Sequence, residues 1–133
     1  MIVDANRYAC TSANCATNGA AEHASGDWVL ENSTTYTRPD GTIIGTTTSA
    51  GIFSFDLTNA LTTTANSAAW TGLNTDWTTS SNTCLNWTVS SRFNNGQWGY
   101  ADRKTSAFIS NTYDVCWSSE KLICVEQNPK KIF

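Results

Sequence analysis

The chain has 133 residues and a formal net charge of −3, and 14% of its residues are charged, against about 25% in an average globular protein. Ser, Thr and Asn replace the missing charges, which argues against a coiled coil, and six Trp argue against disorder. Basic runs stop at Lys130-Lys131, and no apolar stretch nears the ~20 residues of a membrane span. We therefore expect one domain, 1–133, that binds no nucleic acid and inserts into no membrane.

In chain order, the first expected element is a helix over Asn6–Ala24, which is rich in Ala and poor in β-branched residues and which Gly26 would end. Proline and glycine in Arg38–Gly41 predict a turn. Short apolar runs predict strands at Trp28–Leu30, Thr42–Ile44, Ile52–Phe55 and Lys121–Glu126. The result is an α+β chain.

A long region from Leu73 to Ser106 separates the last two of these strands. It holds three of the six tryptophans among Asn, Thr, Ser and Gly, a composition typical of loops. We expect this region to project from the scaffold formed by the strands and the helix.

The five cysteines indicate disulfides and an oxidising compartment, so we place the protein outside the cytoplasm. Their odd number leaves one thiol free or paired between chains. No C-x2-C pair is present and His23 is the only imidazole, so zinc is not expected. A dyad of Cys10 or Cys15 with His23 is the one catalytic candidate, but His23 fits a polar surface position better. Without a G-x-S-x-G motif, we expect no enzyme.

Four motifs follow one another with a characteristic order and spacing. They are the I-F-S-F-D strand within Gly51–Asp56, the W-x-G of Trp70–Gly72, the C-x-x-W of Cys84–Trp87, and the C-x7-C-[IV]-E of Cys116–Glu126. Together with the position of Cys15, they resemble the endostatin domain, the C-terminal module of certain vertebrate collagens, and a family of bacterial surface proteins similar to it.

This resemblance implies a C-type lectin-like fold of the endostatin type, with a mixed sheet, one or two helices and a long loop region. It also implies two nested disulfides, Cys15 with Cys124 and Cys84 with Cys116. Cys10 has no counterpart in the pattern, so we expect it to be unpaired or to bridge two chains.

The cofactors and anionic ligands of the related families do not transfer. Endostatin binds heparin through clustered arginines and zinc through an N-terminal histidine-rich segment, whereas the four arginines here are scattered and that segment is missing. Sugar-binding C-type lectins hold calcium with E-P-N, Q-P-D and W-N-D motifs, and none of these occurs. We expect no metal and no cofactor, with calcium at Asp40, Asn74 or Asp76 as the alternative.

The loop region mixes aromatic rings with amide, carboxylate and guanidinium groups, the chemistry of a sugar or peptide site. Tryptophans beside the matched motifs, Trp70, Trp87 and Trp117, are expected in the core. The candidate ligand-binding residues are Asn74, Asp76, Trp77, Asn95, Gln97, Trp98, Tyr100, Asp102 and Arg103.

We therefore predict an extracellular ligand-binding or adhesion module of a bacterial surface protein, cut from a longer exported chain. Its partner would be a glycan or a protein on another cell or matrix, and a neutral one because the chain lacks clustered arginines. The alternative is a structural or oligomerising cap on a fibre or lipoprotein, a homotrimer in the full-length protein, since endostatin domains end collagen chains that trimerise.

Overall fold

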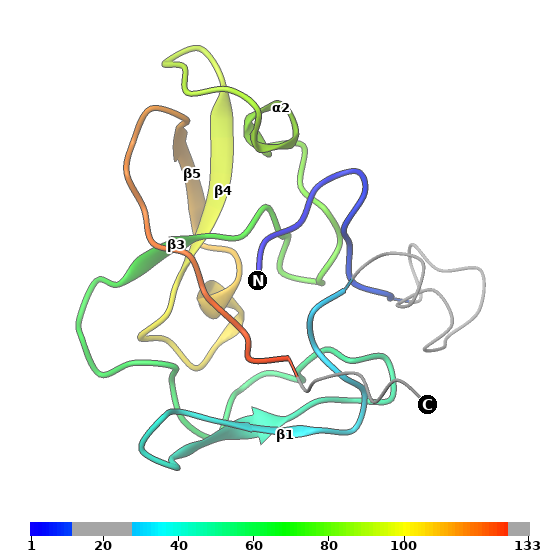
Figure 1. Cartoon of the computed structure of the whole chain (residues 1–133). Helices are drawn as coiled ribbons and strands as arrows, with labels where there is room; N and C mark the ends of the chain where they lie inside the picture. The colour runs from blue at the N-terminus through cyan, green and yellow to red at the C-terminus, as the bar shows by residue number, and fades with distance from the viewer. Residues whose placement is uncertain (12–27, 128–133) are drawn as a thin grey trace.

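The structure, a computed structural model, describes residues 1–11 and 28–127 (Figure 1). The described strands form a two-stranded and a three-stranded sheet, both antiparallel. The elements are β1 (Thr35–Thr37), β2 (Ile43–Thr46), β3 (Ala68–Trp70), α2 (Cys84–Trp87), β4 (Asn95–Tyr100), η1 (Ser106–Phe108) and β5 (Thr112–Val115). Small sheets therefore dominate, with little helix, which is compatible with a small α+β or mostly-β domain.

β1 and β2 form a hairpin around the predicted turn. The carbonyl of Arg38 accepts a hydrogen bond of 2.9 Å from the amide of Gly41, whose φ of +86° suits glycine. Thr35 pairs with Thr46 across the ladder, and their hydroxyls lie 2.8 Å apart. The turn and the strand at Ile43–Ile44 are confirmed.

β4 is the central strand of the second sheet, between β3 and β5, so the expectation that all of Leu73–Ser106 projects from the scaffold as loops is wrong. Successive side chains of a strand alternate between the two faces. Gln97 and Gly99 face η1 and the segment after it. The side-chain amide of Gln97 donates to the Ser110 hydroxyl at 3.1 Å, and a Cβ on Gly99 would overlap the Phe108 carbonyl. Trp98 and Tyr100 therefore lie on the opposite face, where both are half-buried.

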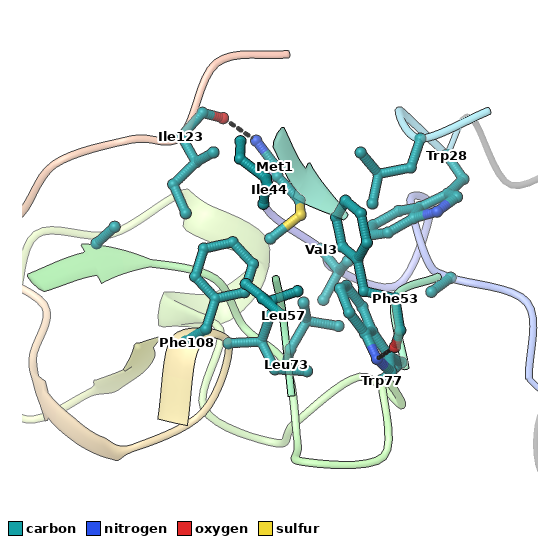
Figure 2. Packing of buried hydrophobic residues seen from close by; sticks show 14 residues of the cluster. Met1, Val3, Trp28, Ile44, Phe53, Leu57, Leu73, Trp77, Phe108 and Ile123 are labelled. Atoms are coloured by element: carbon teal, nitrogen blue, oxygen red, sulfur yellow. Dashed lines mark hydrogen bonds between the residues drawn. The ribbon is translucent and has the colours of Figure 1, made fainter. Parts of the chain in front are cut away.

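The core lies where the hairpin, the three-stranded sheet and the N-terminal segment meet (Figure 2). Val3 is fully buried, and its amide donates to the Thr71 carbonyl at 2.8 Å, which fixes the N-terminal segment beside β3. The Met1 amine donates to the Ile123 carbonyl from the other side (Figure 2). Contacts between residues far apart in the sequence thus enclose one hydrophobic core.

The predicted disulfide between Cys84 and Cys116 is present and closes 32 residues. It begins α2, whose four residues all have positive φ, from +49° to +60°. This is a left-handed turn built without glycine, a conformation that costs about 1–2 kcal/mol per residue. Trp87 anchors it by donating its indole N–H to the Val3 carbonyl at 2.8 Å.

The expected pairing of the other cysteines is wrong. Cys124 is a free, exposed cysteine, so it forms no bridge to Cys15, which itself lies outside the described residues. The expectation that Cys10 is unpaired or bridges two chains is also wrong, because Cys10 is buried and disulfide-bonded within the single chain. The predicted disulfide between Cys15 and Cys124 is therefore not formed.

Four expected elements also differ. Ile52–Phe55 was expected to be a strand, but it joins no ladder, and Phe53 is buried in the core without backbone pairing. Asn6–Thr11, the described part of the predicted helix Asn6–Ala24, is not helical, because the carboxylate of Asp4 accepts the backbone N–H groups of Asn6 and Arg7 in a turn instead. Trp28–Leu30 is buried in the core but joins no ladder. Of Lys121–Glu126, only Lys121 makes a single bridge, to Ala69, so no closing strand forms. Neither helical turn in residues 1–11 and 28–127 has the length of a membrane-spanning helix.

Candidate ligand-binding site

The nine predicted ligand-binding residues fall in three different places. Two belong to an exposed turn, two are buried, and the rest lie along β4 and the turn that follows it. In the described part of the chain, this last group is the one in which predicted residues contact each other directly through their side chains.

Asn74 and Asp76 form the exposed turn. The Asp76 carboxylate accepts from the Thr78 hydroxyl at 2.5 Å and from the Thr78 amide at 3.1 Å, and these bonds lower the pKa of Asp76, the hydroxyl more strongly. The Asn74 side chain donates to the same hydroxyl at 3.0 Å. Both side chains therefore use their polar groups to hold the turn.

Trp77 and Gln97 are not on the surface, so their assignment to the ligand site is wrong. Trp77 is 3% exposed and stacks on Phe55 with ring centroids 5.7 Å apart. Its indole N–H donates to the Phe53 carbonyl at 3.1 Å (Figure 2). Gln97 is buried on the core side of β4. Each is fixed by partners inside the fold.

The remaining residues give what we call the β4 cluster, formed by Trp98, Tyr100, Asp102 and Arg103. The Trp98 and Tyr100 rings meet edge to face with centroids 4.7 Å apart. The Arg103 guanidinium lies 5.5 Å from the centre of the Tyr100 ring and 3.8 Å from the Asp102 carboxylate. Asn95 stands at the far end of the same strand, half-buried.

Asp102 and Trp98 carry the unusual feature of this cluster. The Asp102 side chain is 8% exposed, and one carboxylate oxygen, Oδ2, accepts the Asn66 amide at 3.2 Å. Its other oxygen, Oδ1, and the indole Nε1 of Trp98 are buried, and neither has a hydrogen-bond partner in the described part of the chain. One acceptor and one donor are thus left unpaired, at a typical cost of about 1–3 kcal/mol each.

A second surface feature surrounds the Cys84–Cys116 disulfide. Leu85, Phe93 and Trp117 are 60%, 82% and 62% exposed, and we call them the disulfide tip. Their backbones are held together because Cys116 donates its amide to the carbonyls of Ser91 and Asn94. The expectation that Trp117 belongs to the core is wrong. Trp70 is buried as expected, and Trp87 packs against it half-buried, with ring centroids 5.8 Å apart.

A pocket of about 280 Å³ lies between the hairpin and the segment 123–126. Tyr36, Phe53 and Phe108 line it with apolar neighbours, and Glu31 and Glu126 are also in its lining. None of the nine predicted ligand-binding residues lines this pocket, and sequence reasoning missed it. Its walls come from the hairpin, the segment 123–126 and residues elsewhere in the chain, among them Met1, Phe53, Leu61 and Phe108, so no local signal in the sequence marks them.

In residues 1–11 and 28–127, no three His, Cys, Asp or Glu side chains gather closely enough to hold a metal ion.

A protein-family model described as a protein of unknown function, DUF1554, matches residues 1–104, and the chain belongs to this family. The matched part includes the whole β4 cluster. No curated protein and no solved structure matches the chain.

Proposed function

We propose that the chain is an extracellular ligand-binding or adhesion module of a bacterial surface protein, with a C-type lectin-like fold of the endostatin type. Its ligand, a neutral glycan or a protein segment, would bind at the β4 cluster. Disulfides at Cys84–Cys116 and at Cys10 support an oxidising compartment, and the endostatin-like motifs support the fold.

The observation that carries this proposal is that the β4 cluster contains one unpaired donor, the indole Nε1 of Trp98, and one unpaired acceptor, Oδ1 of Asp102. Buried polar groups are nearly always paired in native proteins, with protein, water or ligand. A hydroxyl both donates and accepts, so one polyol ligand suits both atoms. The Trp98 and Tyr100 rings add apolar faces of the kind on which sugar rings stack.

Arg103 is the residue of the cluster that a ligand would contact from solvent. Its side chain is 51% exposed and contacts both Tyr100 and Asp102, so its guanidinium can donate hydrogen bonds to a ligand bound at the cluster. Its charge is balanced by the Asp102 carboxylate, and the chain as a whole carries −3. Both facts favour a neutral ligand over a sulfated one.

The test is retention on an array of neutral and sulfated glycans, with matrix proteins printed beside them. Wild-type protein and the control Asp76→Asn should be retained on the same neutral spots, while Asp102→Asn and Arg103→Gln should bind about tenfold more weakly. Arg103→Gln changes an exposed side chain, so it separates lost binding from lost folding. The proposal fails if nothing is retained, or if all four proteins bind alike.

The alternative, an oligomerising cap, is favoured by the disulfide tip, since exposed apolar patches often mark protein contacts. Multi-angle light scattering distinguishes the two functions. A binding module predicts a monomer, whereas a cap predicts a stable oligomer that Phe93→Ser dissociates. Phe93 suits this test because it is the most exposed of the three tip residues, and its replacement should leave the core intact.

A further inference from the structure

We infer that the pocket between the hairpin and the segment 123–126 binds a small organic ammonium, a ligand with a positive head and a compact apolar body. This site is separate from the β4 cluster, none of whose residues line it. The inference therefore stands or falls independently of glycan binding.

The walls of the pocket are aromatic and aliphatic. Tyr36 and Phe53 pack edge to face with centroids 5.9 Å apart, and Phe108, Ile44 and Ile123 complete the apolar lining. A volume of about 280 Å³ is at the lower end of the range for ligand pockets, which restricts the occupant to a small molecule. Aromatic walls attract cations through the negative faces of their rings.

The charge of the lining selects a cation. Glu31 and Glu126 place two exposed carboxylates in the lining, and neither lysine nor arginine is among the lining residues. The one positive group there is the Met1 amine, which already donates to the Ile123 carbonyl and whose pKa is lowered, mainly by burial. The carboxylates therefore set the sign of the potential at the pocket.

Three of the four hydroxyls among the lining residues already take part in hydrogen bonds, which disfavours a polyol. The Tyr36 hydroxyl accepts the Glu31 amide at 2.8 Å, the Thr34 hydroxyl donates to the Asn32 carbonyl at 2.8 Å, and the Thr35 hydroxyl pairs with Thr46. A ligand would be held by ring faces and carboxylates, and these groups recognise an alkylammonium better than a sugar.

Choline and 3,3-dimethylbutan-1-ol provide a matched pair of probes, because they share a shape and differ in charge. In NMR titrations of the full chain, choline should shift the signals of Tyr36 and Phe53 and bind about tenfold more tightly than the neutral isostere. Glu31→Gln and Glu126→Gln should each weaken choline about threefold and leave the isostere unchanged. Glu120→Gln, a carboxylate outside the lining, should change neither.

The inference is overturned if the two probes bind equally, or if choline at about 50 mM leaves the pocket signals unmoved. Vesicles then identify the source of the ammonium. Binding to phosphatidylcholine vesicles, abolished by Glu126→Gln, assigns a lipid headgroup, and binding of free choline without vesicle binding assigns a soluble ligand. Binding to phosphatidylglycerol vesicles alone contradicts the proposed charge preference.

Discussion

Thr78 controls the ionisation of Asp76, because both bonds to that carboxylate come from this one residue. The pKa of Asp76 is lower folded than unfolded, so its contribution to stability is complete above the unfolded value of about 3.9 and is lost as pH falls through the folded pKa. Thr78→Val removes the stronger bond and keeps the amide. We predict that this change raises the pKa of Asp76 towards its ordinary value.

The measurement is a carbon-13 NMR titration of the Asp76 carboxyl in both proteins. Asp40 is the internal control, because its pKa is lowered by Thr42 in another turn and should not respond. Equal midpoints for Asp76 in the two proteins would show that the Thr78 hydroxyl does not stabilise the charged form.

The same scale shows why residue types alone misassign a binding site. Trp77 and Trp98 both stand among Asn, Thr and Gly, and the sequence predicts the same role for each. Trp77 is buried because Phe53 and Phe55, more than 20 residues away in the sequence, pack on it. Trp98 is only half-buried, because it lies on the face of β4 opposite the buried Gln97. Burial depends on such distant partners, which local composition does not specify.

Among the elements, α2 allows a test of whether glycine or alanine gives the more stable protein at a position with positive φ. Leu85 is exposed and has a φ of +51°. In an ordinary right-handed helix glycine is about 1 kcal/mol less stable than alanine, but in a left-handed turn the order reverses. We predict that Leu85→Gly is more stable than Leu85→Ala by about 1 kcal/mol in urea unfolding. A more stable alanine variant would contradict the left-handed turn.

Elements governed by local chemistry were predictable, and those that need a distant partner were not. The turn at Arg38–Gly41 and the strand after it were predicted correctly, because proline and glycine determine them within a few residues. Lys121–Glu126 has the composition of a strand but finds a ladder partner only at Lys121. Its alternating burial, with Ile123 inside and Leu122 outside, resembles a strand without the pairing.

For the whole molecule, the Cys84–Cys116 bridge is the main covalent restraint in the described ranges. Closing 32 residues contributes about 3.7 kcal/mol in the chain-entropy model, a large share of the ~5–15 kcal/mol typical of a domain. The resemblance gave this pair correctly and the Cys15–Cys124 pair incorrectly. Five cysteines permit many pairings, and spacing alone does not choose among them.

The candidate site was predictable in part for a related reason. The sequence located the β4 cluster because its residues are close neighbours in the chain, within 98–103. The pocket between the hairpin and the segment 123–126 is also lined by Met1, Phe53, Leu61 and Phe108, so it becomes visible only in three dimensions.

The most direct test follows the indole N–H signals of the six tryptophans by NMR while methyl glycosides of glucose, galactose, mannose and N-acetylglucosamine are added. We predict a saturable shift of the Trp98 indole signal with at least one glycoside, because the indole N–H is unpaired. The Trp77 indole, bonded to Phe53, should stay in place. A Trp98 signal unmoved by all four at about 50 mM, or one that moves only together with Trp77, would contradict glycan binding at the β4 cluster.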